Sequence, residues 1–315
     1  MNSNINNRIM VSVCCLAYNH EKYLRDALEG FVNQKTDFFY EVLIHDDAST
    51  DNTARIIKEY ANKYPDKIKG IFQNENQYSQ GVDVLGKYVY PRAKGRYIAL
   101  CEGDDYWTDQ NKLQMQFNAL ENHPESDMCA HRAEWYNCLK EEIIRIFPDI
   151  DDNRILSVEE VIYGEGGFLP TASLFFRKEI VLDPMPFQKT WNIDYSLQIR
   201  GALRGGIVFV AKTMALYRFY TVGSWSSKKN DKTVLETLNN KRKEMLNELN
   251  KDTDELYKEV IDKRLRKNEF NKLIKENNFS QAIGKEYKVY IAEMSISKRI
   301  KLYFKAFFSR LTSMH

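Results

Sequence analysis

The sequence predicts an α/β domain with a doubly wound, mostly parallel sheet flanked by helices, followed by a helical C-terminal extension. Three observations support this prediction: strand-like and helix-like segments alternate in the first half, acidic side chains follow several of the strands, and the composition changes near Ser226. The chain has 315 residues, of which 43% are hydrophobic and 29% charged. This composition is typical of a globular protein and supplies ample material for a core.

The alternating segments occupy the first half of the chain. Segment 9–17 is β-rich and mostly apolar, as a strand buried on both faces of a sheet must be. The next helix has apolar residues at helical spacing from Tyr23 to Phe31, and Asn19 is its expected N-cap. The further elements expected in this half are strands at 41–44, 68–72 and 96–101 and helices at 51–64 and 109–122. Such alternation predicts a parallel sheet with helices on its faces.

The rest of the chain is less regular at first and then becomes polar. The middle offers a strand at 172–177, a helix near 195–203 and a strand at 207–211. Residues 228–315 hold 21 basic and 13 acidic side chains, whereas residues 1–227 hold 25 basic and 31 acidic ones. We therefore expect a first domain at 1–226, whose halves are 9–130 and 131–226, and a basic helical extension at 227–315.

Composition also excludes several classes of protein. No apolar run approaches the ~20 residues that span a bilayer, so a transmembrane protein is excluded. The polar N-terminus lacks the apolar region of a secretory signal. The five cysteines fit no zinc pattern, and buried thiols in a reducing cytoplasm are the expected interpretation. We expect a cytoplasmic protein with no nucleic-acid partner.

The strongest chemical signal is a group of carboxylates after the strand at 96–101. Ligands bind at the carboxyl ends of the strands in doubly wound sheets. Glu102, Asp104 and Asp105 stand there within four residues, around a glycine. Charges packed this closely repel one another unless a cation or solvent relieves them, and hard divalent cations prefer carboxylate oxygens. The pattern favours a metal site over the alternative, a solvated acidic turn.

Two further groups lie where earlier strands end. Asp47 follows the second predicted strand and could accept hydrogen bonds from a base edge or a ribose hydroxyl. Its neighbours Ser49 and Asp51 could instead cap the next helix. Tyr18 follows the first strand and could stack on a base, although a buried strand-end tyrosine is the alternative.

Three segments in this order resemble family 2 glycosyltransferases, which have the GT-A fold: VSVCCLAYNHEKYLRDAL, DDASTDNT and GRYIALCEGDDYW. The resemblance is strong over residues 9–123. It continues more loosely through residues 191–197 and 214–225, and GFLPTAS at 167–173 resembles the acceptor-side loop of the family.

The resemblance implies a nucleotide-sugar donor, commonly linked to uridine, and an acceptor hydroxyl on a glycan or a lipid-linked saccharide. The implied donor-binding residues are Leu16 through its backbone, Tyr18, Asn19, Asp47 and Asp104. The implied ligands of Mn²⁺ or Mg²⁺ are Glu102, Asp104 and Asp105, at the position of the D-x-D motif of the family. Asp194 matches the catalytic base of inverting members, and its alternative role is to cap the helix near Tyr195.

The sequence departs from the family pattern at three places, and two of them, Glu102 and Tyr220, keep a non-catalytic rival open. Glu102 replaces the first aspartate of the metal motif, Leu16-Ala17 replaces Pro-Thr, and Tyr220 stands where many members carry a histidine near the diphosphate. One rival is a module that binds nucleotide sugars without transfer. The other is a nucleotidyltransferase that makes the sugar nucleotide, but the Gly-rich, basic loop that such enzymes have after their first strand is absent here.

The C-terminal segment carries a separate signal. Between residues 296 and 311, aromatic and aliphatic residues recur at helical spacing among lysines and arginines. A basic amphipathic helix of this kind suits a membrane interface, and we expect peripheral attachment to the inner face of the membrane. The alternative is a helix that packs on the catalytic domain or in a homodimer.

Overall fold

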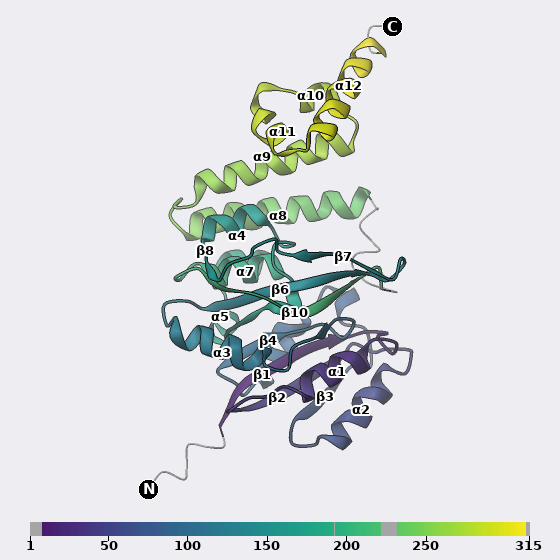
Figure 1. Cartoon of the computed structure of the whole chain (residues 1–315), viewed down its shortest axis with the longest axis vertical. Coiled ribbons are helices and arrows are strands. Elements are labelled where there is room, and N and C mark those ends of the chain that lie inside the picture. Colours follow the sequence, from purple (N-terminus) through teal and green to yellow (C-terminus); the bar gives the residue numbers. More distant parts are fainter. Residues whose placement is uncertain (1–7, 192, 222–231, 313–315) are drawn as a thin grey trace. The chain divides into compact units, whose positions relative to one another are not determined.

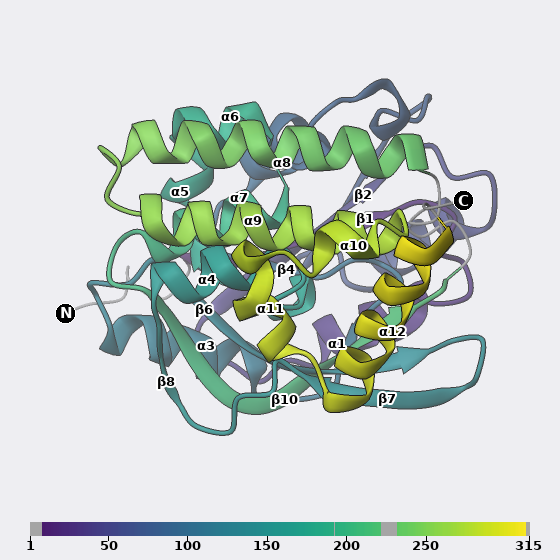
Figure 2. The ribbon, with the colours of Figure 1, turned by 90° about the horizontal axis from the view of Figure 1, so that it is seen from above.

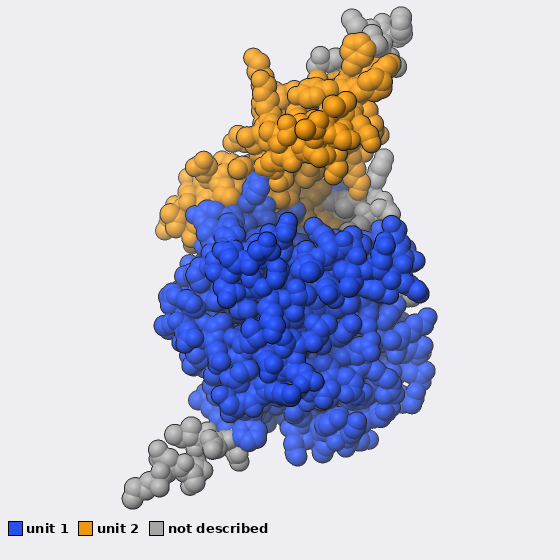
Figure 3. Space-filling view, in the orientation of Figure 1, with its two compact units in different colours: residues 1–237 blue, residues 238–315 orange. Residues whose placement is uncertain are grey.

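The structure is a computed structural model that describes residues 8–191, 193–221 and 232–312, without the side chains of 232–235 and 310–312. The chain divides into two compact units, residues 1–237 and 238–315, which Figure 3 shows in different colours. The two units are described separately below. The boundary that we expected after residue 226 lies outside the described residues and stays a prediction.

A single mixed sheet of ten strands forms the centre of the first unit (Figure 1). Eight strands follow one path across it, in the order β3 (Ile68–Phe72), β2 (Phe39–Asp46), β1 (Ile9–Ala17), β4 (Tyr97–Leu100), β9 (Phe175–Arg177), β6 (Met128–Asn137), β10 (Ile207–Phe219) and β5 (Tyr106–Trp107). The remaining two are β7 (Glu142–Phe147), which pairs with β6, and β8 (Arg154–Leu156), which pairs with β10.

The predicted parallel sheet forms one half of this path. β3, β2, β1 and β4 are parallel to one another, and β6 is parallel to β10. β9 lies antiparallel to both β4 and β6, so the sheet is mixed where the two parallel parts meet. The α/β prediction is confirmed, and the antiparallel strands come from the middle of the chain, where the sequence pattern was least regular.

The described α-helices between the strands of the first unit are α1 (Leu24–Val32), α2 (Thr53–Lys63), α3 (Lys112–Asn122), α4 (Val158–Gly164), α5 (Glu179–Leu182), α6 (Pro186–Thr190) and α7 (Asp194–Ala202). All predicted elements of the first half are present, with ends that shift by a few residues. The prediction that Asn19 caps the first helix is wrong. Tyr23 is the N-cap of α1, and Asn19 adopts a left-handed conformation with φ 56°.

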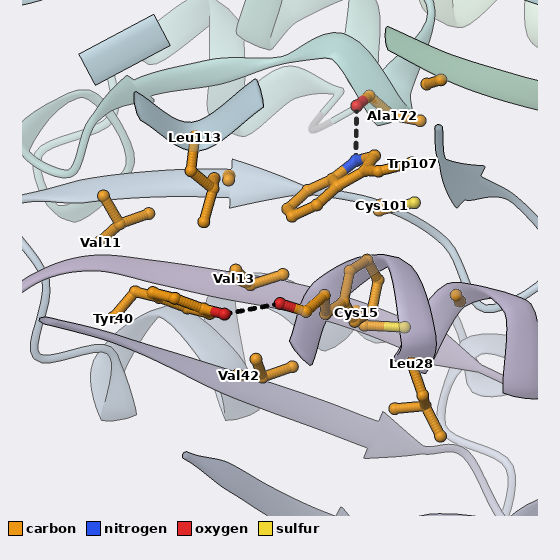
Figure 4. Packing of buried hydrophobic residues seen from close by; sticks show 14 of the residues in the cluster. Val11, Val13, Cys15, Leu28, Tyr40, Val42, Cys101, Trp107, Leu113 and Ala172 are labelled. Atoms are coloured by element: carbon orange, nitrogen blue, oxygen red, sulfur yellow. Dashed lines mark hydrogen bonds between the residues drawn. The ribbon is translucent and has the colours of Figure 1, made fainter. Parts of the chain in front are cut away.

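The core lies between the sheet and its helices, and Figure 4 shows part of it around β1, α1 and Trp107. Two buried hydrogen bonds cross this region. The Tyr40 hydroxyl donates to the Phe31 carbonyl at 2.8 Å, and Trp107 Nε1 donates to the Ala172 carbonyl at 3.0 Å. Trp107 therefore ties β5 to a segment 65 residues further along the chain.

The second unit is helical and has a small core of its own. It contains most of α8 (Lys232–Asp252), together with α9 (Lys258–Lys275), α10 (Phe279–Ala282), α11 (Lys288–Glu293) and α12 (Ile296–Thr312). α10 packs against both α9 and α12 (Figure 2). The core residues are Phe270, Ala282, Tyr287, Tyr290, Ile291 and Leu302. Among the described helices, none is long and apolar enough to span a membrane.

Candidate functional site

The carboxyl ends of β1, β2 and β4 meet at one edge of the sheet, because these strands are adjacent and parallel. The loops after β1 and β2 are bonded to each other there. Asn19 accepts a hydrogen bond from the Thr50 amide at 2.8 Å through its side chain, and its own amide donates to Ser49 Oγ at 2.9 Å. Tyr18 lies beside this junction with 41% of its surface exposed. The structure thus brings together two of the segments that carried the family resemblance.

Asp47, which the sequence predicts to contact a nucleotide, also binds a segment of the protein backbone. Its two carboxylate oxygens accept hydrogen bonds from the amides of Gln77 and Tyr78, at 2.9 and 3.0 Å. The buried Asp47 side chain therefore anchors the segment after β3, which contains the short 3-10 helix Tyr78–Gln80. Each oxygen retains a further lone pair, so the predicted contact with a nucleotide remains compatible with this anchoring role.

Gly103 allows the acidic turn after β4 to approach the end of β1. Its amide donates to the Leu16 carbonyl at 2.8 Å, and a Cβ atom at this position would lie 2.9 Å from Nδ1 of His20. A side chain at residue 103 would thus push the turn away from the loop after β1. This close approach places Glu102 and Asp104 next to the predicted donor-binding residues.

The three carboxylates of the turn have different environments. Asp104 accepts a hydrogen bond from Thr221 Oγ1 at 2.7 Å, and His20 Nε2 lies 3.9 Å from the same carboxylate oxygen. Asp105 is only 1% exposed; its Oδ1 accepts the Arg218 amide at 2.8 Å, and its Oδ2 has no partner in the described part of the chain. Glu102 is half-buried.

Burial raises the pKa values of Glu102, Asp105 and Asp194. Burial, followed by the charges of Asp104 and Asp194, raises the pKa of Glu102 to about 8. Burial and the two neighbouring carboxylates raise the pKa of Asp105 well above its ordinary value. Burial also raises the pKa of Asp194, and the hydrogen bond from Thr171 opposes this rise. A cation between these groups would relieve the repulsion.

Asp194, the predicted base, comes from α7, about 90 residues after the acidic turn in the chain. It is the first residue of α7, and Ile193 is the N-cap of that helix, so Asp194 does not have the capping role that was its alternative. Its carboxylate accepts a hydrogen bond from Thr171 Oγ1. Thr171 lies on the segment that leads into β9, and the Leu100 amide at the end of β4 donates to the Leu174 carbonyl of that segment at 3.0 Å. The charge of Asp194 is also among the causes that raise the pKa of Glu102. These observations place the predicted base on the same side of the sheet edge as the acidic turn.

A divalent cation suits the donor chemistry of Glu102 and Asp104. Among the residues that the structure describes, no three His, Cys, Asp or Glu side chains form a complete metal-binding group. Mg²⁺ in nucleotide-dependent enzymes often takes only one or two carboxylates and completes its coordination with phosphate oxygens and water. Two crowded carboxylates at this edge fit that pattern. Asp105 fits it less well, because one of its oxygens is bonded to β10.

Sequence reasoning missed Arg218, which stabilises the acidic turn. Its side chain donates to the Asp104 carbonyl at 2.9 Å and pairs with Asp26 of α1. The guanidinium also lies over the rings of Tyr23 and Tyr106, 5.2 and 4.7 Å from their centroids. These partners are far away in the chain, so no local sequence pattern could have indicated them.

Tyr220 and Thr221 directly follow β10 and are the last described residues before position 222. Tyr220 has φ 66° and packs its ring 3.9 Å from that of Phe219, between centroids. The hydroxyl of Thr221 provides the contact to Asp104 that the sequence did not suggest. Residues 222–225, which complete the last segment of the resemblance, lie outside the described residues.

Comparison with known families agrees with this geometry. A family model described as Glycosyl transferase family 2 matches residues 12–223, which is more than half of the chain. The chain belongs to glycosyl transferase family 2. The matched region contains every site residue named above, from Leu16 to Thr221.

Two relatives show how this family member compares with other proteins. It is 40% identical over 224 residues to the Mycobacterium tuberculosis H37Rv protein named Uncharacterized protein Rv1520, which covers 70% of this chain. The chain spans only 62% of the length of that relative. It is also 38% identical over 114 residues to the Bacillus subtilis protein named Minor teichoic acid biosynthesis protein GgaB, covering 36% of this chain and 12% of that protein.

Solved structures confirm the GT-A type of fold. Staphylococcus aureus TarS 1-349, solved with UDP-GlcNAc, has a TM-score of 0.62 and 18% identity, over 89% of this chain and 78% of TarS. The mannosyltransferase PcManGT from Pyrobaculum calidifontis, solved with GDP-Man and Mn²⁺, has a TM-score of 0.52 and 13% identity, over 98% and 88%. At these identities the likeness concerns the fold alone.

Proposed function

We propose that this protein is a glycosyltransferase that moves a sugar from a nucleotide-sugar donor, UDP-linked, to an acceptor hydroxyl with inversion of the anomeric carbon. The observation that carries the proposal is the hydrogen bond from Thr171 to Asp194, on a segment that is bonded to the end of β4 through the Leu174 carbonyl and the Leu100 amide, directly before the Glu102–Asp104 turn. Family membership and the nucleotide-sugar complexes of the two structural neighbours support it.

The donor would occupy the edge formed by the loops after β1 and β2. Tyr18 offers an exposed ring for a base or ribose, and the backbone of Leu16 and Asn19 would contact the nucleotide beside it. Asp47 would accept a hydrogen bond from the base while it anchors the segment after β3. The diphosphate would then point toward Asp104, on the turn after β4.

Glu102 and Asp104 would hold a Mn²⁺ or Mg²⁺ ion together with the diphosphate, and Asp105 would support the turn from behind. When bound, the cation supplies charge stabilisation to the departing nucleoside diphosphate. Asp194 would accept the proton of the acceptor hydroxyl while the hydroxyl oxygen bonds to the anomeric carbon. The bond between that carbon and the diphosphate oxygen breaks in the same displacement, so no enzyme nucleophile is needed.

Calorimetric titration with UDP, GDP and CDP, with and without Mn²⁺, tests the donor site. We expect binding of UDP that requires Mn²⁺ and is lost in Asp104→Ala. Asp194→Asn should lower kcat by about 10²–10⁴-fold and leave UDP binding intact. Full activity of Asp194→Asn would refute the base assignment, and UDP binding without any transfer would favour the non-catalytic module. Release of pyrophosphate from UTP and a sugar 1-phosphate would instead favour the nucleotidyltransferase.

We further propose that the acceptor is a glycan of the cell envelope on a lipid carrier, and that α12 touches the membrane. The name of the B. subtilis relative supports the first part. For the second part, α12 buries Leu302 and Ala306 and leaves an exposed apolar face: Ile296, Ile300, Tyr303, Phe304, Phe307 and Phe308. Lys298, Arg299, Lys301 and Lys305 stand among these residues and would attract anionic lipid headgroups.

Sedimentation with vesicles of anionic lipid at low salt tests the membrane contact. The full chain should sediment with them, and a variant with Ile300→Gln and Phe304→Gln should stay in the supernatant with unchanged UDP binding. A control variant with Ile143→Gln and Ile144→Gln, on the exposed strand β7, should sediment like the wild type. Failure of the wild type to bind would refute the contact, and a dimer that dissociates in the α12 variant would assign this face to a second copy.

A further inference from the structure

We propose that Thr171 is a positioning residue that orients the Asp194 carboxylate, and that a buried polar network from β5 and α3 fixes Thr171. This inference rests on the proposed role of Asp194 as the base. Thr171 begins the 3-10 turn Thr171–Ser173, and its hydroxyl donates to Asp194 Oδ2. Within the described ranges, no other side chain donates to Asp194.

The hydrogen bond from Thr171 to Asp194 Oδ2 restricts the orientation of the Asp194 carboxylate. The hydroxyl fixes the rotation of the carboxylate, so Oδ1 keeps a defined direction in which to accept a proton. Without this bond, repulsion from Glu102 would act on a carboxylate that is free to rotate. Because displacement of a reacting group by 1 Å can cost about 10²-fold in rate, orientation of this kind has catalytic weight.

The two carbonyls that follow Thr171 are held by side chains from other elements. Trp107 Nε1 donates to the Ala172 carbonyl at 3.0 Å, as Figure 4 shows, and Gln116 Nε2 donates to the Ser173 carbonyl at 2.8 Å. Within the turn, Ser173 Oγ donates to the Pro170 carbonyl at 2.7 Å. Ala172 and Ser173 are completely buried. The backbone of the turn is therefore fixed on both sides of the Thr171 side chain.

Lys112 of α3 contacts both Gln116 and Trp107, the two side chains that donate to the turn. Its ammonium donates to Gln116 Oε1 at 2.7 Å and lies 3.9 Å from the centroid of the Trp107 ring. Because Gln116 Nε2 donates to the Ser173 carbonyl, its Oε1 is the atom that faces Lys112 Nζ. Lys112 and Gln116 are both fully buried. The network thus runs from α3 to the carbonyls of Ala172 and Ser173, and the backbone of the turn connects these to Thr171, whose hydroxyl contacts Asp194.

Kinetics of Thr171→Val and Thr171→Ser test the proposal. Thr171→Val removes the donor, and we expect kcat to fall about 10- to 100-fold while the donor KM changes by less than about two-fold. Thr171→Ser keeps the hydroxyl and should recover most of kcat. Thr36→Val is the matched control, because it removes a hydroxyl that donates to the Phe38 carbonyl at 2.7 Å, in the loop between α1 and β2. It should keep the kcat of the wild type.

A double-mutant cycle separates orientation of Asp194 from general damage. If Thr171 acts through Asp194, Thr171→Val should change kcat by less than about two-fold in an Asp194→Asn background. An equal loss of kcat in both backgrounds, or a wild-type kcat for Thr171→Val, would overturn the proposal. Thr171→Ala replaces the valine variant if the latter fails to fold. Full activity of Asp194→Asn alone would instead overturn the base assignment.

Discussion

At the scale of single residues, Glu102 links the electrostatics of the site to stability. In the metal-free protein, burial and two neighbouring carboxylates raise its pKa to about 8, whereas an unfolded chain restores its ordinary value near 4.5. Between these values the folded state holds a proton that the unfolded state has released. Stability from this group is therefore complete below about pH 4.5 and is lost as the pH rises through about 8.

Glu102→Gln should remove this pH dependence. In EDTA, we expect the variant to gain stability relative to the wild type between pH 5 and pH 8.5, by at least about 1 kcal/mol, as measured by urea denaturation. Glu59→Gln is the control, because Glu59 is exposed and Arg25 lowers its pKa, so its stabilising effect is lost only in acid. A constant difference between Glu102→Gln and the wild type would contradict the raised pKa.

At the scale of elements, Arg218 joins β10, α1 and the acidic turn. Its backbone and side chain bond to Asp105 and Asp104, while its guanidinium pairs with Asp26. The side chain of Arg218 is only 10% exposed, and its guanidinium lies over the rings of Tyr23 and Tyr106. Loss of this residue should disturb the turn that carries the predicted metal ligands.

Arg218→Met should lower the free energy of unfolding by about 1–3 kcal/mol, because it leaves Asp26 and the Asp104 carbonyl without their donor. Affinity for UDP with Mn²⁺ should fall about 10-fold, measured by calorimetry. Arg25→Met is a matched control, since Arg25 also pairs with a carboxylate, Glu59, but is 44% exposed. It should cost less than about 1 kcal/mol and leave UDP binding unchanged. Wild-type affinity in Arg218→Met would contradict the role of Arg218.

The strands and helices of the structure differ from the predicted ones mainly in the middle of the chain. Alternating segments predicted β1 to β4 and their helices, because local periodicity reports burial directly. The strand at 172–177 was predicted and is present as β9, but its antiparallel direction and the extension of β10 to Phe219 were not predicted. These features depend on partners far away in the chain, such as β6 and β4, and not on local periodicity.

At the scale of the molecule, the two compact units have separate cores. All four tryptophans, at positions 107, 135, 191 and 225, belong to residues 1–237. Tryptophan fluorescence therefore reports unfolding of the first unit alone, whereas far-UV circular dichroism reports both. Comparing the two signals during unfolding therefore tests whether the two units unfold independently of each other.

Thermal unfolding should give two transitions that respond differently to ligand. UDP with Mn²⁺ at about 100 times Kd contributes about 2.7 kcal/mol to the state that binds it, which should raise the fluorescence-detected Tm by about 5–10 °C. The second transition, seen by circular dichroism, should not move. A single transition by both probes, shifted equally by the ligand, would contradict independent units.

The fold class, the family and the acids at the strand ends follow from the amino-acid sequence, because local periodicity and short motifs encode them. Three contacts appear only in the folded chain: the bond from Thr171 to Asp194, the anchoring of the segment after β3 by Asp47, and the support of the turn by Arg218. Each of these facts joins residues that are far apart in the chain. Such contacts arise from packing of the whole sheet, which no local pattern encodes.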